Sequence, residues 1–466
     1  MRSAESEMIK EIVRKLPNFI KRPTKRVYNS IPDNLKYGKV FNDTYSFLQE
    51  SQYWSKEKLE EYQMNEITKL LNHSYKNVPY YRKVFDERGL KPRDIQNFND
   101  LKQLPYLTKE IIQNNLEDLV ARNYDKRNLT YVTTGGSTGI PMGFYADKRV
   151  VRPREWAFMT TQWSRVGYDI NKKNKCVILR GNIPEKGLYE YDGKDLILSS
   201  YQLTDNNMKM YINMIKKFEP DFIQAYPSSI SILSDFILQN DIKLNLYNLK
   251  AILCGSENLY DFQRIKIKDA FNVRVYSWYG HTEVSCLAGE CEKSSSYHIF
   301  PEYGYTELIN ENDNDVTGED EVGEIVATGF NNYAVPFIRY KTMDLAVNTN
   351  KVCSCGRNYK LIKRIEGRKQ DYFINRYGNK ITFTCSDDAL WRVNDKIFAY
   401  QYIQNEPGKV ILTIEPKKEL DAKDYKCIRQ DFLKFYPDFE IEIKLVEHIE
   451  RTKRGKYKFL IQKLKI

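Results

Sequence analysis

Glycines and hydroxyl side chains are concentrated between Tyr131 and Arg149, in the stretch YVTTGGSTGIPMGFYADKR. Consecutive backbone N–H groups in such a turn can form an anion-binding nest. The residues that would form it are Thr134, Gly135, Gly136, Ser137, Thr138 and Gly139. The stretch is not a Walker A motif, because Gly139 is followed by Ile140 and Pro141 rather than by Lys and Ser or Thr. It predicts a phosphate-binding loop, and a plain hairpin or linker is the alternative.

Four further segments join this loop in a pattern that resembles the signature motifs of adenylate-forming enzymes. In order along the chain, the five segments are TTGGSTGIP, SWYGHTEVS, PFIRYKTMDLAV, RIEGRKQDYFI and ERTKRGKYK. More narrowly, the chain is similar to the phenylacetate-CoA ligase-like family, especially its capsule-biosynthesis (CapK-like) branch. That narrower similarity is carried by NVPYYRKVF, LPYLTKE, QAYPSSI, ECEKSSSYHI and CSCGRNY. The resemblance runs from about residue 55 to the C-terminus.

The resemblance implies an AMP-forming ligase that joins a carboxylate to the α-phosphate of ATP and expels pyrophosphate. Two anions must meet in that reaction, so the site needs N–H donors and positive charge where charge accumulates. Ser137, Thr138 and Gly139 would hold the β- and γ-phosphates, and Thr282 would hydrogen-bond the α-phosphate. Glu283 would bind Mg²⁺ through its carboxylate, as a hard cation prefers.

The remaining nucleotide contacts are also implied by the resemblance. Tyr279, followed by Gly280 and His281, offers a flat face for adenine. The alternative interpretation of this motif is a strand end with a buried Tyr and a capping Thr. Gly255, Ser256 and Glu257 are expected beside the adenine, Asp344 on the ribose hydroxyls, and Arg368 on the ribose or a phosphate. A turn aspartate and a surface ion pair are the alternatives for Asp344 and Arg368.

Lys456 is the predicted catalytic cation, with Thr282 and Glu283 as its partners in catalysis. In relatives, the matching lysine bridges the carboxylate and the α-phosphate during adenylation. Its neighbours Lys453, Arg454 and Lys458 allow a simpler interpretation, a solvated basic tail. The hinge of the small C-terminal domain is expected just after Arg368, where Gln370 departs from the Asp or Lys that relatives commonly carry.

Cys353 and Cys355 are too close in sequence for ordinary pairing with each other, and soft thiolates two residues apart suit a metal. Cys291 and His298 would complete a set of three cysteines and one histidine, and relatives carry similar residues at both stretches. The set predicts a structural zinc site. Four partly buried side chains without metal are the alternative.

The acid and the acceptor are less well specified. The acyl pocket is expected between residues 155–168, the AYPSSI segment and the YGHTE strand, where aromatic side chains would suit phenylacetate or simply form core. Arg180, Arg154 and the serines of PSS favour a more polar acid, such as an amino acid or a uronic acid. The acceptor would be an amine or sugar-linked group, giving an amide, or the thiol of coenzyme A. A non-catalytic nucleotide-binding scaffold of envelope assembly is the rival from another class.

The elements that must position these residues follow from hydrophobic periodicity. Ser55 is expected to cap a helix with apolar residues at Leu59, Tyr62, Ile67, Leu70 and Leu71, broken at Pro79. From about residue 130, short apolar runs alternate with amphipathic stretches, which predicts a mostly parallel sheet covered by helices on both faces. Ligands then bind at the carboxyl ends of the strands.

We therefore expect an α/β protein with a large adenylation domain and a small mobile α+β lid. The predicted bounds are 1–54 for a basic helical extension, 55–368 for the large domain and 369–466 for the lid. The chain of 466 residues is 41% hydrophobic, enough for a large core.

The formal charge of +11 is concentrated at the two ends. Ten Lys/Arg stand against four Asp/Glu in residues 1–40, and eight against three in residues 441–466. No zinc-finger spacing or RNP-like motif favours nucleic acid, so we expect none as a partner. The basic ends are compatible with peripheral contact to an anionic membrane, and equally with a solvated surface. With no apolar segment resembling a signal peptide, a cytoplasmic location is expected, including the inner membrane surface.

Overall fold

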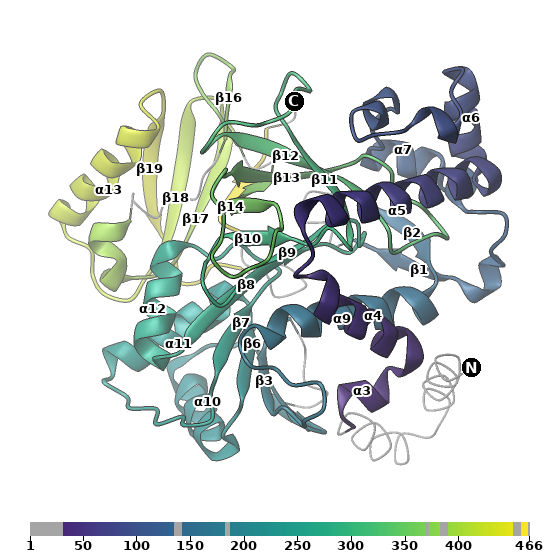
Figure 1. Ribbon diagram of the computed structural model, residues 1–466. Coiled ribbons are helices and arrows are strands. Elements are labelled where there is room, and N and C mark those ends of the chain that lie inside the picture. The colour runs from purple at the N-terminus through teal and green to yellow at the C-terminus, as the bar shows by residue number, and fades with distance from the viewer. Residues whose placement is uncertain are drawn as a thin grey trace.

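The computed structural model describes residues 31–134, 142–181, 187–368, 372–382, 390–450 and 458–464 (Figure 1). One large sheet crosses most of the protein. Its strands are β3 (Cys176–Leu179), β4 (Tyr189–Asp192), β5 (Asp195–Leu198), β6 (Phe222–Ala225), β7 (Ala251–Cys254), β8 (Arg274–Gly280), β9 (Leu287–Gly289), β10 (Tyr297–Ile299), β11 (Gly304–Ile309), β12 (Val322–Gly329), β13 (Tyr340–Asn348) and β14 (Leu361–Arg368).

This twelve-stranded sheet has the spatial order β11-β12-β13-β14-β10-β9-β8-β7-β6-β3-β5-β4. Strands β5, β3, β6, β7 and β8 are parallel, as the alternation of apolar runs and helices predicts. From β8 to β9 the pairing becomes antiparallel and stays so to the β11 edge. The predicted α/β fold is confirmed, with its parallel strands confined to one half of the sheet.

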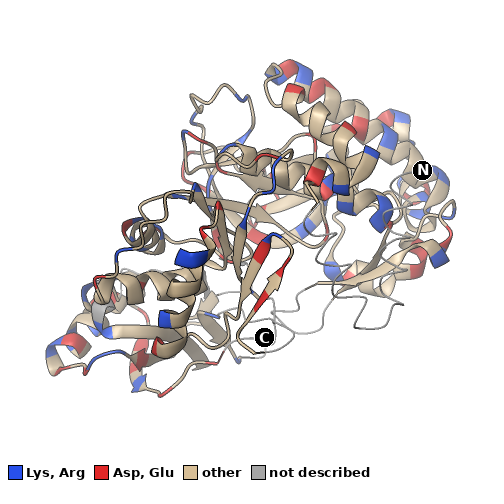
Figure 2. Cartoon of the chain, turned by 90° about the horizontal axis from the view of Figure 1, so that it is seen from below, with Lys and Arg blue, Asp and Glu red and all other residues tan. Residues whose placement is uncertain are grey.

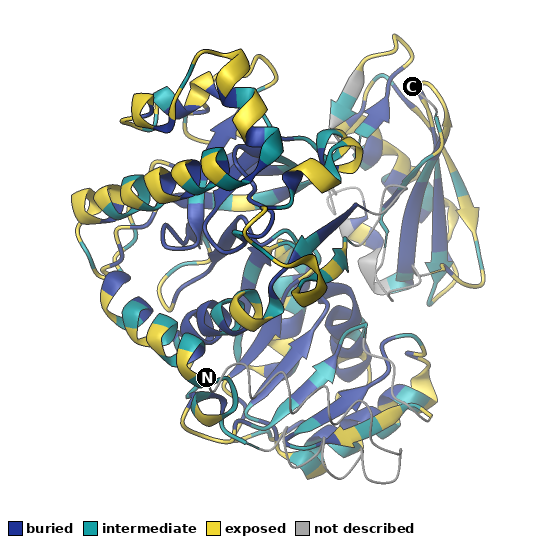
Figure 3. Cartoon of the chain, turned by 90° about the vertical axis from the view of Figure 1, so that its right-hand side faces the viewer, coloured by how far each residue is buried: buried dark blue, intermediate teal, exposed yellow. Residues whose placement is uncertain are grey.

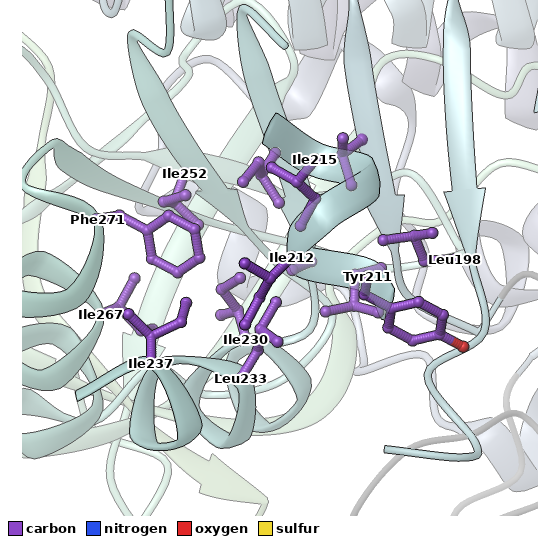
Figure 4. Packing of buried hydrophobic residues seen from close by; sticks show 14 of the residues in the cluster. Leu198, Tyr211, Ile212, Ile215, Ile230, Leu233, Ile237, Ile252, Ile267 and Phe271 are labelled. Carbon is purple, nitrogen blue, oxygen red and sulfur yellow. The ribbon is translucent and has the colours of Figure 1, made fainter. Parts of the chain in front are cut away.

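Helices cover both faces of the parallel half. The α-helices of the described chain are α3 (Asp33–Lys36), α4 (Gly38–Ser51), α5 (Lys56–Asn77), α6 (Pro79–Glu87), α7 (Lys109–Asn114), α8 (Leu116–Leu119), α9 (Lys148–Ser164), α10 (Asp205–Phe218), α11 (Pro227–Gln239), α12 (Asp261–Phe271) and α13 (Ala422–Phe435). Helices α10, α11 and α12 bury Ile212, Ile230, Leu233 and Ile267 against one face (Figure 4). Helices α4 and α9 bury Phe41, Phe158 and Trp163 against the other.

Local sequence explains the start and end of helix α5. The side chain of Ser55 accepts a hydrogen bond from the backbone N–H of Lys58 and caps the helix, as predicted. Val78 is extended because it precedes a proline, and Pro79 then begins α6. The charged outer face of α5 lies in solvent, while Ile67, Leu70 and Leu71 are buried.

A second body follows β14. It contains the short hairpin β15 (Tyr372–Ile374) and β16 (Lys380–Thr382), and a four-stranded sheet in the order β19-β18-β17-β20. The strands of that sheet are β17 (Ile397–Glu406), β18 (Lys409–Pro416), β19 (Glu440–Leu445) and β20 (Leu460–Gln462). Helix α13 and the sheet enclose a core of their own (Figure 3). The predicted domain bounds at 54 and 368 stay predictions.

Among the described residues, an ion pair and a ring contact connect this second body to the large one. Lys417 forms an ion pair with Asp235 of α11, and the ring of Phe459 packs edge-on against Tyr260, which precedes α12. At the other end of the described chain, α3 and α4 lie against α9, with the Tyr168 hydroxyl 2.5 Å from Asp33 and Tyr37 beside Trp156.

Charged side chains of both signs are interspersed over the outer helices (Figure 2). Among the described helices, none combines the length and apolar character that a bilayer crossing requires. The basic residues 1–30 and 451–457 lie outside the described part of the chain.

Candidate functional site

Two of the predicted nucleotide segments and the AYPSSI segment of the predicted acyl pocket leave the sheet side by side. Ala225 of β6 pairs with Cys254 of β7, and Cys254 pairs with Ser277 of β8. The chain therefore leaves these parallel strands at one edge, through YPSS, GSE and YGHTE. This is the edge at which open α/β sheets bind ligands.

The carboxylate of Glu283 is held by two side chains. Its Oε1 accepts a hydrogen bond from the Tyr340 hydroxyl at 2.9 Å, and its Oε2 lies 3.2 Å from Nδ1 of His281. Burial acts to raise the pKa of Glu283, but these hydrogen bonds and the charge of His281 outweigh it and hold the pKa below its usual value. The structure thus presents an ionised carboxylate, as a cation ligand requires.

His281 is fixed on both sides of its ring. Burial acts to lower its pKa, while the hydrogen bond and the charge of Glu283 raise it above the usual value. Its Nε2 lies 3.4 Å from the Ser285 hydroxyl. His281 therefore positions Glu283. The neighbouring Thr282 is exposed, two residues beyond the end of β8.

Tyr279 and Asp344 are joined directly. The buried Tyr279 hydroxyl donates a hydrogen bond to Oδ2 of Asp344 at 2.8 Å, across the sheet from β8 to β13. Burial, and then the charge of Asp344, raise the pKa of Tyr279 well above its usual value. Asp344 is paired in register with Arg368 of β14. The structure thus brings together the residues predicted for adenine and ribose.

The GSE segment turns sharply after β7. Gly255 lies against the indole of Trp278, where a Cβ would come within 2.5 Å of the ring. Ser256 has a φ of +69°, and the Glu257 carboxylate accepts a hydrogen bond from the backbone N–H of Ser228 at 3.1 Å. Glu257 therefore ties the end of β7 to the first turn of α11.

Left-handed backbone conformations gather around these segments. Ser256, Val284, Arg339 and Met343 all have positive φ. The other non-glycine residues of this kind in the described chain are the C-cap Glu219 of α10 and five Asn or Asp residues, which tolerate turns, namely Asp241, Asn245, Asn272, Asp313 and Asp320. For a β-branched residue such as Val284 this conformation is strained. Strain of this kind is held at sites where neighbouring structure fixes the backbone, as at functional sites.

The glycine loop is described only at its base. Strands β1 (Thr130–Thr133) and β2 (Gly143–Ala146) form a hairpin, and Thr134 extends it by bonding the backbone of Met142. Gly135, Gly136, Ser137, Thr138 and Gly139 lie outside the described residues, as does Lys456. Arg368 is described only as the last residue of β14. Their predicted roles stay predictions.

Sequence reasoning missed two contributors to this site. Tyr340 orients Glu283, although the RYKTMD segment that contains it was recognised for Asp344. Glu155 of α9 accepts a hydrogen bond from Tyr303, and burial raises the pKa of Glu155 above its usual value. No sequence signal marks Glu155, because only the packing of α9 brings it into the electrostatic reach of His281.

The predicted metal ligands form a compact cluster. One ligand atom from each of Cys291, His298, Cys353 and Cys355 lies within 4.8 Å of all the others. The Sγ atoms of Cys291 and Cys353 are 3.5 Å apart, and Sγ of Cys355 is 3.3 Å from Nε2 of His298. Zinc–thiolate bonds of about 2.3 Å in a tetrahedron place sulfur atoms about 3.8 Å apart. The donor set fits zinc.

Neighbouring groups prepare these ligands. Nδ1 of His298 lies 3.2 Å from the carbonyl oxygen of Ser296, which leaves Nε2 facing the cluster. Burial and the nearby Arg165 lower the pKa of His298 to about 4, so its ring is neutral. Burial acts to raise the pKa of Cys355, but hydrogen bonds from Arg357 lower it overall. The cluster joins β9, β10 and the β13–β14 connection.

Comparisons with known proteins agree with the fold. Residues 373–463 match the CapK C-terminal domain. Protein CapK of Staphylococcus aureus is 26% identical over 417 residues, covering 87% of this chain and 89% of that protein. A phenylacetate-coenzyme A ligase of Thermus thermophilus is 23% identical over 384 residues, covering 81% and 85%.

Solved structures share the architecture. A 2-hydroxyisobutyryl-CoA ligase, in complex with 2-HIB-AMP in its postadenylation state, has a TM-score of 0.70 at 17% identity, covering 89% of this chain and 93% of that one. The acyl acid amido synthetase AtGH3.15 has a TM-score of 0.57 at 14% identity, covering 87% and 89%. The fold is that of adenylate-forming enzymes. Within the sequence comparisons, the chain is similar to CapK and to phenylacetate-coenzyme A ligases over most of its length, and its residues 373–463 match the CapK C-terminal domain.

Proposed function

We propose that the protein is an ATP-dependent, AMP-forming carboxylate ligase. The observation that carries this proposal is the ionised Glu283, held by Tyr340 and His281 beside the Tyr279–Asp344 pair at the carboxyl end of β8. Relatives that are named ligases, and a neighbouring structure with a bound acyl-adenylate, support it.

The reaction proceeds in two steps. A carboxylate oxygen of the acid attacks the α-phosphorus of ATP, a new P–O bond forms, and pyrophosphate leaves. The nucleophile of the acceptor then attacks the carbonyl carbon of the adenylate, loses its proton to solvent, and AMP leaves. The adenylate forms in the first step and is consumed in the second. It must therefore stay bound after pyrophosphate leaves, until the acceptor attacks it.

Each residue has a defined task in the first step. Tyr279 lies against adenine and Asp344 accepts hydrogen bonds from the ribose hydroxyls, while the exposed Thr282 bonds the α-phosphate. Glu283 would hold Mg²⁺, which would supply positive charge to the phosphates. Lys456 meets the carboxylate and the α-phosphate, and the loop from Gly135 to Gly139 holds the departing pyrophosphate. We place Lys456 on a C-terminal lid, residues 369–466, that takes a different pose for each step.

The acceptor is an amine or a sugar-linked group in surface polysaccharide modification. The resemblance of the sequence motifs to the capsule-biosynthesis branch favours this choice. Transfer to the thiol of coenzyme A is the second candidate, favoured by the phenylacetate-coenzyme A ligases among the relatives. The protein would act in the cytoplasm, and its basic termini would bring it to anionic, lipid-linked precursors at the membrane surface.

A structural zinc ion completes the proposal. Cys291, His298, Cys353 and Cys355 would hold it and join the segment after β9 to the connection between β13 and β14. Because β13 carries Asp344 and Tyr340, the ion would stiffen the strand that supports the nucleotide site. It takes no part in the chemistry.

Acid-dependent exchange of pyrophosphate into ATP tests the proposed function. The assay is run without acceptor, over panels of aryl acids, amino acids and uronic acids. We expect at least one acid class to support exchange in the wild type, and Glu283→Gln to lower it by about 10²–10³. Glu311→Gln, at an exposed position, is the matched control. Exchange that no acid stimulates would reject a ligase.

A further inference from the structure

Arg180 follows the last residue of β3 and lies on the face of the sheet that α9 covers. Val177 and Leu179 are buried in the core on the opposite face, while Cys176, Ile178 and Arg180 keep partial exposure. Side chains alternate along a strand, so Arg180 shares the face of Cys176 and Ile178. Cys176 packs there with the core formed by α4 and α9.

This guanidinium has no anionic partner in the described part of the chain. Burial lowers the pKa of Arg180. The phenol of Tyr226 and the thiol of Cys176 act to raise this pKa, and neither of these groups is a carboxylate. Arg180 forms no hydrogen bond or ion pair with a described residue. Its five N–H donors therefore keep partial access to solvent and are open to an anionic ligand.

Gln224 places a second polar side chain on the same face, and this side chain also has no hydrogen-bond partner among the described residues. It is 6% exposed and pairs in register with Ile178 on the neighbouring strand β6. The adjacent Phe222 belongs to the core under α9, which fixes the face of Gln224 by alternation. The Gln224 amide forms no hydrogen bond with a described residue, although it is more than nine-tenths buried. Two neighbouring strands thus present N–H donors without acceptors.

The position of Arg180 separates it from the reacting end of the site. Strand β3 is followed in the sheet by β6, β7 and β8, and Thr282 and Glu283 come after β8. With neighbouring strands about 4.8 Å apart, the ends of β3 and β8 are about 14 Å apart. A carboxylate that reacts beside Thr282 is therefore too far from Arg180 to bind the guanidinium as well.

We propose that the acid substrate carries a second anionic group, and that Arg180 and Gln224 bind this group at the end of the substrate remote from the reacting carboxylate. This inference rests on the proposed function and narrows its substrate to acids with two anionic groups. A site whose partly buried cation is left for the substrate discriminates against an analogue that lacks the matching charge.

Binding of matched acid pairs tests this inference without turnover. Phenylacetate is compared with para-carboxyphenylacetate, and dicarboxylic acids of graded length are compared with monocarboxylic acids of the same length. Isothermal titration calorimetry measures each acid on the wild type and on Arg180→Met, Arg180→Lys and Arg152→Met. Arg152 lies exposed on α9 and provides the matched control.

The wild type should bind one dianionic acid about tenfold to a hundredfold more tightly than its monoanionic partner, as expected for hydrogen bonds to a charged group. Arg180→Met should abolish the preference, Arg180→Lys should keep part of it, and Arg152→Met should keep it all. Without ligand, Arg180→Met should melt no lower than the wild type, because it removes a partly buried charge that forms no ion pair with a described residue.

The inference is overturned if no dianionic acid is preferred, or if Arg180→Met keeps the preference. It is also overturned if the substitution changes only the affinity for coenzyme A, which would assign Arg180 to the acceptor. A wild type that prefers the dianionic acid but supports no acid-dependent pyrophosphate exchange would instead reject the proposed function, and the anion subsite would stand.

Discussion

The hydroxyl of Tyr340 donates a hydrogen bond to Glu283 across 2.9 Å, and so joins the start of β13 to the turn that follows β8. Glu283 is at the same time in contact with His281, two residues before it in sequence. A carboxylate fixed from both sides has little freedom to leave its orientation. This pre-organisation is what a metal-binding carboxylate requires.

Tyr340→Phe should weaken magnesium binding while leaving the fold intact. The substitution keeps the ring and removes one hydrogen bond, whose net value is about 1 kcal/mol, so the apparent KM for Mg²⁺ should rise about fivefold. The measurement is pyrophosphate exchange at varied Mg²⁺ and saturating ATP. Tyr247→Phe, at a tyrosine that is 92% exposed, is the control. An unchanged Mg²⁺ dependence would remove Tyr340 from the account.

Asp195→Asn should stabilise the protein at neutral and alkaline pH. Burial raises the pKa of Asp195 to about 7 from its ordinary value of 3.8, and its Oδ1 is buried without a hydrogen-bond partner in the described residues. The folded state keeps this proton up to about pH 7, whereas the unfolded state loses it near pH 4. The free energy of unfolding of the wild type therefore falls through that interval and is flat above it.

The asparagine variant lacks this pH dependence. Above pH 7 it should exceed the wild type in free energy of unfolding by an amount on the order of a few kcal/mol, with the difference vanishing near pH 4. Denaturant unfolding at several pH values measures it. Asp269→Asn, at an exposed position on α12, is the control. A difference that does not depend on pH would show that Asp195 is ionised in the folded state.

Cys355→Ser should remove a bound zinc ion. Metal analysis of protein never exposed to a nickel column should find about one zinc per wild-type chain and far less in the variant. The melting temperature should fall, because the ion joins three segments of the sheet. Cys427→Ser, at a partly exposed cysteine on α13, should change neither quantity. Wild-type protein that is free of zinc would contradict the assignment.

Local sequence predicts much of the fold because local physics determines it. The apolar runs that contain Val177, Ile223 and Ile252 become parallel strands, and Ser55 begins α5 as its hydroxyl predicts. Phe439, Ile441 and Leu445 alternate with mostly charged residues, a pattern that predicts a strand with one buried face. Phe439 and Ile441 are buried, as the pattern predicts. Leu445 is 48% exposed at the end of β19, where the core no longer covers it.

The contacts between site residues that are far apart in the chain could not be predicted from local sequence. Tyr340 and Glu283 are 57 residues apart, and the antiparallel half of the sheet that brings them together has no marked periodicity. Arg180 shows the same limit. The sequence offered it as a polar residue near the acid, but only the sheet order and its lack of a partner separate it from the reacting centre.

The two half-reactions of Lys456→Ala test the central claim most directly. The account predicts that acid-dependent pyrophosphate exchange falls by about 10²–10³, since one charge is lost from the first transition state. Transfer from a preformed acyl-adenylate to the acceptor should be largely spared, and Lys453→Ala should alter neither step. Exchange that stays within about threefold of the wild type would contradict the claim that this lysine draws the acid onto the nucleotide.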